Sequence, residues 1–281
     1  MKKFLCTLLL LMSIVMFGRI IKTEEYEEKN GILIEKITGK PFTGIISDKT
    51  VNGSYEYVYY KGRLNGGITE SYPNGKLKEE GFYRNGKEEG LFKRYSANGK
   101  LISEENYKNG ELDGQTKIYF ENGNLFLEVK VNSGKRESFV KEYYESGKLK
   151  SEGSFKNEKL DGISKEYYEN GSIFREKNYK KGLIQGIYKT YYENGNLFIE
   201  SNYKNGIPEG ICKIYYENGK ISSEINYKNG AFNGISKEYY ENGKLKTEVN
   251  YKNGKQDGAY KSYLENGKLE QIIIYRDGVK K

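Results

Sequence analysis

The chain has 281 residues, with 47 Lys and Arg against 39 Asp and Glu, 28 Tyr, two Cys, and neither His nor Trp. The absence of His excludes the commonest general base, the Ser-His and Cys-His nucleophile pairs and most zinc sites. The net charge of +8 is mild for a chain so rich in charge, and Lys and Glu interleave at fixed offsets, so a nucleic-acid partner is not expected.

The N-terminus has a short basic start, Met1–Lys3, followed by a run without charge from Phe4 to Gly18. This pattern is typical of a secretory signal peptide, and the run is shorter than the ~20 apolar residues of a membrane-spanning helix. We therefore expect residues 1–21 to direct export to the periplasm, the outer envelope or the medium. The alternative is an uncleaved anchor, in which residues 4–21 hold the protein at the inner membrane.

Two short segments precede the regular part of the chain. Residues 22–40 form a charged leader with one predicted strand, Gly31–Ile37. Residues 41–65 resemble a degenerate repeat, because Gly44 and Gly66 lie 22 residues apart while later glycines keep a longer spacing. Terminal units of an array differ from the others because they cap the stack.

From residue 66 to residue 281 the sequence repeats every 24 residues, nine times, without insertion or deletion. We number the positions of each unit as registers 1 to 24, starting at residues 66, 90, 114, 138, 162, 186, 210, 234 and 258. Register 10 is always Gly, and the unit GISKEYYENGKLKTEVNYKNGKQD, which starts at Gly234, shows the pattern. A period of this size indicates a repeat array, in which stability comes from stacking neighbouring units.

Each unit predicts two strands. Asn-Gly between strand-like runs is the strongest short hairpin signal, and a two-residue turn at registers 9 and 10 would place both residues at positive φ. That turn pairs register 4 with 15, 6 with 13, 7 with 12 and 8 with 11. The predicted fold is all-β: an elongated, single, twisted antiparallel sheet of stacked 24-residue hairpins.

Charges support this register. Register 4 is Lys in eight of nine units and register 15 is Glu in eight of nine, so the pairing would set opposite charges side by side. Each exposed pair adds only about 0.2–1 kcal/mol, but a repeated row of pairs penalises any slip of the strands.

Tyrosines fall into columns at registers 6, 7 and 18. Two interpretations of the columns are compatible on different faces: packing of neighbouring units against each other, and an aromatic surface that binds a ligand. The candidate interaction surface is the column at register 6, which consists of Tyr95, Tyr119, Tyr143, Tyr167, Tyr191, Tyr215, Tyr239 and Tyr263.

The phrase G-x-x-K-x-Y-Y-E-N-G-x-L-x-x-E-x-x-Y-K-N-G resembles the bacterial MORN repeat variant, over Gly66 to Lys281 with a weaker unit before it. The resemblance implies an elongated antiparallel sheet of stacked hairpins. It also implies roles seen in that family, such as antitoxin components of toxin–antitoxin systems or secreted and surface proteins. The eukaryotic MORN pattern has Trp and His positions that this chain lacks.

Enzymatic chemistry is not expected, because the carboxylates recur in nearly every unit whereas an active site is needed once. The sequence has no Walker phosphate loop, no GxGxxG after a strand and no kinase catalytic loop. We predict no catalytic residue, no cofactor and no metal site. Cys212, at the variable register 3, is expected to be an exposed neutral substitution.

The last strand, Leu269–Tyr275, departs from the pattern, because register 15 is Ile272 and the run continues with Ile273 and Ile274. An edge strand of this kind invites pairing with another strand, so Ile272, Ile273 and Ile274 are candidate docking residues for a partner or a second copy. The alternative is simple capping, with the isoleucines packed on the preceding unit.

Together these features predict a non-catalytic, exported repeat scaffold that binds a protein or an envelope polymer along its sheet. One alternative is an antitoxin-like partner of a toxin, which would need no export signal. Another is peripheral binding to anionic membrane lipid through the Lys column at register 4, which salt would weaken steeply.

Overall fold

A computed structural model describes residues 20, 21, 23–133 and 135–281. The chain divides into two compact units, Met1–Lys135 and Arg136–Lys281. The predicted export segment lies outside the described residues except at its end, where Ile20 and Ile21 form the short strand β1. None of the described helical structure is long and apolar enough to cross a membrane.

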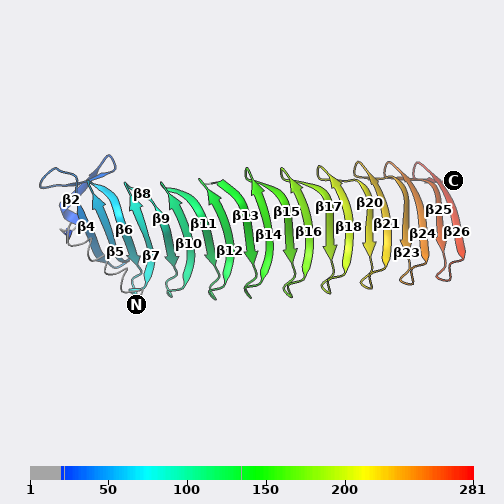
Figure 1. The fold of residues 1–281 in the computed structure, drawn as a ribbon, viewed down its shortest axis with the longest axis horizontal. Coiled ribbons are helices and arrows are strands. Elements are labelled where there is room, and N and C mark those ends of the chain that lie inside the picture. The colour runs from blue at the N-terminus through cyan, green and yellow to red at the C-terminus, as the bar shows by residue number, and fades with distance from the viewer. Residues whose placement is uncertain (1–19, 22, 134) are drawn as a thin grey trace. The chain divides into compact units, whose positions relative to one another are not determined.

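In the N-terminal unit the strands lie side by side in one layer (Figure 1). Consecutive strands pair in antiparallel fashion, and β1 joins β4 in parallel. The strands of this sheet are β1 (Ile20–Ile21), β4 (Gly44–Thr50), β5 (Gly53–Tyr60), β6 (Arg63–Ser71), β7 (Leu77–Arg84), β8 (Lys87–Glu88), β9 (Gly90–Tyr95), β10 (Leu101–Lys108), β11 (Glu111–Tyr119) and β12 (Leu125–Asn132).

The leader is more structured than the sequence suggested. A 3-10 turn, η1 (Thr23–Glu25), leads into a hairpin of β2 (Tyr26–Lys29) and β3 (Ile32–Glu35), where one strand was predicted. Leu33 of β3 packs with Phe42, which is completely buried, and with Ile46 of β4. The hairpin therefore covers the apolar side chains at the start of the array and acts as its cap.

The C-terminal unit, taken by itself, is likewise a single layer of antiparallel strands, drawn from green to red in Figure 1. Its strands are β13 (Lys135–Tyr143), β14 (Leu149–Lys156), β15 (Lys159–Tyr167), β16 (Ile173–Lys180), β17 (Leu183–Tyr191), β18 (Leu197–Lys204), β19 (Ile207–Pro208), β20 (Gly210–Tyr215), β21 (Ile221–Lys228), β22 (Ala231–Phe232), β23 (Gly234–Tyr239), β24 (Leu245–Lys252), β25 (Lys255–Tyr263), β26 (Leu269–Arg276) and β27 (Val279–Lys280). The predicted fold class, an antiparallel β-sheet of stacked hairpin repeats, is confirmed.

The predicted pairing of registers 4 and 15 is also confirmed. Lys165 lies opposite Glu176, and Lys237 lies opposite Glu248. The same Glu also faces register 4 of the following unit, as Glu248 faces Lys261. Lys at register 4 and Glu at register 15 therefore alternate from strand to strand, both within a repeat and between neighbouring repeats.

The turn that produces this pairing is not the predicted one. At registers 7 to 11, the N–H of Gly243 donates to the carbonyl of Tyr240 at 2.8 Å. The N–H of Tyr240 donates to the carbonyl of Lys244 at 2.9 Å. Gly243 has positive φ whereas Asn242 does not. This is a type I turn closed by a left-handed Gly, and the predicted pairs of register 7 with 12 and of 8 with 11 are wrong.

One extra residue explains why the register survives. Tyr239 pairs with Leu245 and Glu238 pairs with Thr247, so Lys246 at register 13 is left over as a β-bulge and the predicted pair of 6 with 13 is also wrong. The observed turn shifts the pairing by one residue relative to the predicted two-residue turn. The extra residue in the bulge shifts it back, so registers 4 and 15 pair as predicted. The turn with both residues at positive φ lies instead at registers 20 and 21, as at Asn253 (φ 49°) and Gly254 (φ 82°).

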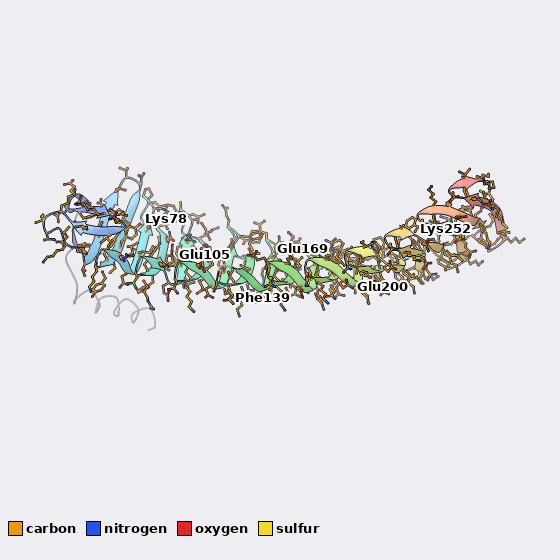
Figure 2. All side chains as sticks on the ribbon, turned by 90° about the horizontal axis from the view of Figure 1, so that it is seen from above. Lys78, Glu105, Phe139, Glu169, Glu200 and Lys252 are labelled. Carbon is orange, nitrogen blue, oxygen red and sulfur yellow. The ribbon has the colours of Figure 1, made fainter. Side chains whose placement is uncertain are left out.

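The two faces of the sheet differ, and side chains project from both (Figure 2). We name the face that carries registers 3, 5, 14, 16 and 18 the packed face. There Phe92 is nearly fully buried between the rings of Tyr83 and Tyr107, with centroids 5.5 and 5.2 Å away. The opposite face, with registers 2, 4, 6, 15 and 17, is named the ladder face.

Cys212 lies on the packed face and is only 8% exposed, so the expectation of an exposed thiol is wrong. Register 3 varies because the space beneath the register 18 rings accepts either small polar or larger side chains, not because solvent covers it. Burial raises the pKa of the Cys212 thiol.

Candidate interaction surface

The ladder face is built on the alternating Lys and Glu row. In the C-terminal unit, Lys165 Nζ lies 3.1 Å from a Glu176 oxygen, and Lys189 Nζ lies 3.3 Å from a Glu200 oxygen. Lys261 bonds back to Glu248 of the preceding repeat at 2.9 Å. Lys165 and Lys189 are thus each placed between two carboxylates, whereas Lys261 lies between Glu248 and Ile272. Because Lys and Glu alternate, the row is close to neutral.

The candidate Tyr residues at register 6 line the same face, and all eight are partly buried. At least five of their hydroxyls donate to the register 15 Glu of the preceding repeat, as Tyr167 does to Glu152 at 2.7 Å and Tyr191 to Glu176 at 3.0 Å. Burial, with the carboxylate hydrogen bond second, raises the pKa of Tyr167 and Tyr191 to about 12. These hydroxyls are bonded to the Glu residues of the Lys and Glu row. The edges of the Tyr rings, and not the hydroxyls, are therefore free to contact a partner.

A row of exposed aliphatic side chains follows register 2 on the same face. Its members in the C-terminal unit are Ile163, Ile187, Ile211 and Ile235, which are 60%, 57%, 51% and 47% exposed. Register 2 and register 4 are two residues apart in one strand, so each Ile lies beside a Lys of the row. Register 2 was not among the candidate positions predicted from the sequence, although it is Ile in these four repeats. The available signal was an aliphatic residue kept on a face that is otherwise charged.

Tyrosines at register 7 connect neighbouring repeats at the turn margin. The Tyr192 hydroxyl donates to the carbonyl of Tyr215 at 2.7 Å, and Tyr216 donates to Tyr239 at 2.6 Å. The ring of Tyr192 also contacts Phe198, a register 13 bulge residue, with centroids 4.8 Å apart. For this column the packing interpretation is confirmed.

The C-terminal edge retains exposed apolar side chains. Ile272 and Ile274 are 53% and 50% exposed, and Ile273 is partly buried opposite Tyr260. Within the described residues, β26 pairs with β25 on one side and with the two-residue β27 on the other, at Tyr275 and Arg276. Ile272 and Ile274 are thus not buried by the preceding repeat, and docking at this edge stays a prediction.

Residues of the metal-ligating and thiol types also lie in the described part of the chain. No group of three or more Cys, Asp and Glu within residues 23–133 and 135–281 is arranged to hold a metal ion. The buried thiol of Cys212 lies near Ser201 and the rings of Tyr203 and Tyr227. The prominent feature of the described chain is therefore a regular surface.

Comparison with known proteins places the repeat in a family. The MORN repeat variant matches nine segments, residues 65–85, 88–109, 112–131, 140–157, 160–181, 184–205, 208–229, 232–253 and 256–277. No curated protein matches the chain. One similar solved structure, titled "Crystal Structure of TcdB2-TccC3-Cdc42", is 12% identical with a TM-score of 0.15; the match covers 90% of this chain but 19% of that one. From its nine matched repeats, the chain belongs to the MORN repeat variant family.

Proposed function

We propose that the protein is a non-catalytic scaffold that binds a protein partner along its ladder face. The observation that carries this proposal is the row of half-exposed Ile residues at register 2 beside the neutralised Lys and Glu row. An apolar row that is repeated and left uncovered is unusual for a soluble surface and is typical of an interaction site.

The geometry suits an extended or repetitive partner. Successive Ile residues are two strands apart, which is ~10 Å at the usual strand spacing, so Ile163, Ile187, Ile211 and Ile235 form a track of ~30 Å. The Lys and Glu row beside the track offers charges of both signs at the same spacing. A protein with apolar side chains flanked by charges could read both rows, and the charges would set its register more than its affinity.

Anionic lipid is a weaker alternative on the same observations. Four Lys residues at register 4, Lys93, Lys165, Lys189 and Lys261, lie 2.9–3.6 Å from Glu carboxylates, and the other four face a Glu on a paired strand. The column therefore carries little net positive charge toward a membrane. An envelope polymer or a toxin could use the same track, and the segment Phe4–Gly18 favours an exported partner over a cytoplasmic toxin. Export is thus part of the proposal.

Binding is tested with the full chain carrying Ile187→Gln and Ile211→Gln. Gln occurs naturally at register 2 in Gln115, so folding should be retained. Partner recovered from an extract of the source cells, quantified by mass spectrometry, should fall at least tenfold. The matched control is Leu183→Lys with Ile207→Lys, which removes two equally exposed aliphatic residues from the turn margin at register 22. Equal loss in both variants, or in neither, would contradict binding by the ladder face.

Export is tested separately by fusing residues 1–30 to a reporter that is active only outside the cytoplasm. An active fusion supports export. Equal cytoplasmic retention of the native chain and of a chain lacking residues 1–21 would contradict it. The two results are independent, because the ladder face lies outside the tested segment.

A further inference from the structure

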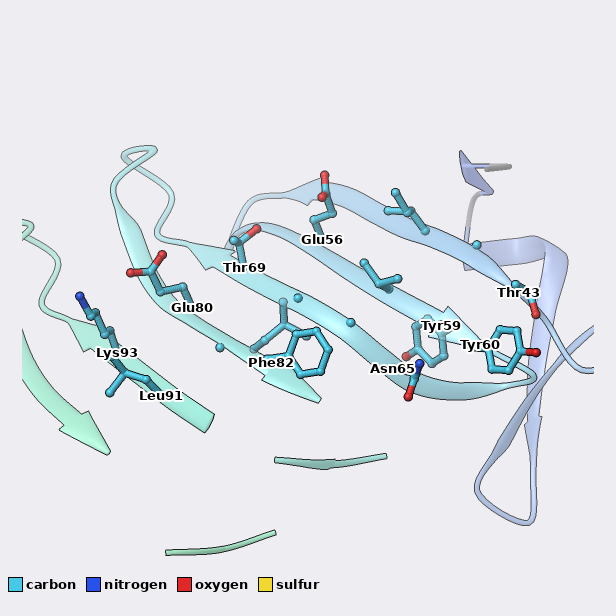
Figure 3. Close-up of a pocket in the computed structure, with 17 residues that line it drawn as sticks. Thr43, Glu56, Tyr59, Tyr60, Asn65, Thr69, Glu80, Phe82, Leu91 and Lys93 are labelled. Carbon is cyan, nitrogen blue, oxygen red and sulfur yellow. The ribbon is translucent and has the colours of Figure 1, made fainter. Parts of the chain in front are cut away.

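A hollow of about 820 Å³ opens on the ladder face at the start of the array, where β4, β5, β6, β7 and β9 lie side by side (Figure 3). Val58, Phe82 and Leu91 supply an apolar lining, and Glu56, Thr69 and Glu80 follow one another on neighbouring strands. We name it the Gly67 hollow. Its volume is in the ~300–1,000 Å³ range of sites for small organic ligands.

The apolar half of the hollow exists because one side chain of the repeat is missing. Register 2 carries Leu91 in the second repeat and Ile in four later repeats, but the first repeat has Gly67. A Cβ added to Gly67 would meet only the carbonyl oxygen of Gly81, at 3.9 Å, and the residue is outside the left-handed backbone region. Gly67 therefore leaves a space that an aliphatic group can enter.

The polar half lacks a cation. Register 4 is Lys in every repeat except the first, where Thr69 stands between Glu56 and Glu80. Elsewhere a Lys in this position separates two carboxylates, as Lys189 separates Glu176 and Glu200. At the hollow the row reads Glu, Thr, Glu, so Glu56 has no Lys on either neighbouring strand and Glu80 keeps only Lys93, on the strand that follows.

The neighbouring groups do not replace it. Among the residues that the structure describes, the Glu56 carboxylate has neither a hydrogen-bond nor an ion-pair partner. Glu80 accepts a hydrogen bond from the neutral Tyr95 hydroxyl at 2.8 Å. The nearest Lys of the row, Lys93, is paired with Glu104 at 3.6 Å. An ammonium that entered between Glu56 and Glu80 would gain two carboxylates and displace no protein cation.

From these two substitutions in one strand, we infer that the Gly67 hollow binds a small molecule with an aliphatic body and a primary ammonium group. The body takes the place of the register 2 side chain, against Val58, Phe82 and Leu91. The ammonium takes the place of the register 4 Lys, between Glu56 and Glu80. The inference concerns the N-terminal unit and is independent of the partner proposed for the Ile track.

The probe is n-octylamine, titrated into the full chain by isothermal calorimetry, with octanoate and 1-octanol as analogues that lack the ammonium. Octylamine should saturate one site per chain, and the analogues should bind at least tenfold more weakly. Octanoate or octanol binding as tightly as octylamine, or no saturable octylamine binding, would overturn the inference.

Two variants restore the repeat pattern and should close the site. Thr69→Lys supplies the missing ammonium, Gly67→Ile fills the apolar half, and each should weaken octylamine binding at least tenfold. Both residues are standard at these registers in other repeats, so folding should be retained. The matched control, Asn196→Lys, adds the same charge at a turn register that is Lys in six repeats, and it should leave binding unchanged.

A third variant tests the site without adding bulk. Glu56→Gln keeps the shape of the side chain and removes one of the two carboxylate charges, so octylamine binding should again weaken by about tenfold while octanol binding stays the same. Unchanged octylamine affinity in Glu56→Gln and Thr69→Lys would overturn the inference. Tighter binding of the peptide acetyl-Ser-Ile-Ser-Lys-Ser-amide than of octylamine would overturn the small-molecule assignment and indicate a partner segment instead.

Discussion

One turn in the array uses an unfavourable residue. At registers 20 and 21 the chain turns through two residues of positive φ, and the second is Gly in eight of the nine repeats. The exception is Glu158, with φ 61°, which follows Asn157 at φ 51°. We predict that Glu158→Gly stabilises the protein, because Gly enters this region without the contact between Cβ and the carbonyl oxygen that other residues suffer.

The size of the effect follows from two opposing contributions. A residue with a side chain loses about 1–2 kcal/mol in the left-handed region. Gly gives back about 0.5–1 kcal/mol, because its unfolded chain has more conformational freedom to lose. The free energy of unfolding should therefore rise by about 0.5–1 kcal/mol.

The reverse substitution is the matched control. Gly254 occupies the same turn position at φ 82°, and a Cβ there would meet only the Ala231 side chain, at 3.9 Å. Gly254→Glu should thus lower the free energy of unfolding by a similar amount, for conformational reasons alone.

Urea unfolding followed by far-UV circular dichroism measures the global change, and amide hydrogen exchange locates it. Exchange in β14 and β15 should slow in Glu158→Gly, because these strands are joined by the altered turn. An unchanged or lower unfolding midpoint in Glu158→Gly, together with a neutral Gly254→Glu, would refute the argument from backbone conformation.

Three further predictions test the contacts between repeats. Tyr192→Phe keeps the ring but removes the hydroxyl that donates to the Tyr215 carbonyl, and should cost about 1 kcal/mol in urea unfolding; no change would show that water replaces the bond without loss. The buried thiol of Cys212 should react with Ellman's reagent far more slowly in the folded protein than in urea, and equal rates would contradict its burial. Because Tyr167 has its pKa raised to about 12 in the folded state, the stabilisation by its hydrogen bond to Glu152 is complete below pH 10 and is lost as pH rises from 10 through 12. Titration of phenolate absorbance should show a late group of tyrosines that unfolding abolishes, and a single transition near pH 10 would contradict it.

The pairing of strands could be predicted from sequence because two columns of opposite charge, Lys at register 4 and Glu at register 15, face each other in only one register. The turn type could not be predicted in the same way. Asn-Gly is compatible with a two-residue turn and with a type I turn closed by Gly, and the difference depends on a bulge several residues away. The bulge itself leaves a trace, because Phe174 and Phe198 at register 13 interrupt the alternation of apolar and polar residues.

Burial was harder to predict than pairing. Cys212 shares register 3 with Ser164, Ser236, Tyr188 and Tyr260, and this variability indicated exposure. In a single-layer sheet the large Tyr rings of neighbouring strands cover such positions, so small side chains are buried beneath larger ones. Strand alternation sets the Tyr column at register 6 on the same face as Lys at register 4, but only the structure shows that hydroxyls of this column are bonded to the Glu row. The Gly67 hollow depends on two departures from the repeat, at Gly67 and Thr69. Only the structure shows that both line one cavity between the neighbouring strands.

The bonds between repeats also bear on how such a chain can change in length. The Tyr192 hydroxyl reaches the Tyr215 carbonyl 23 residues ahead, and the same step recurs from Tyr168 to Tyr191 and from Tyr216 to Tyr239. These junctions therefore present the same donor to the same acceptor, although Ser96 and Phe120 replace the donor Tyr at two other junctions. Loss or duplication of 72 nucleotides, one whole repeat, by unequal recombination would rejoin compatible surfaces and alter only the length of the Ile track. A deletion of any other size would misplace the donor, the charges and the bulge together.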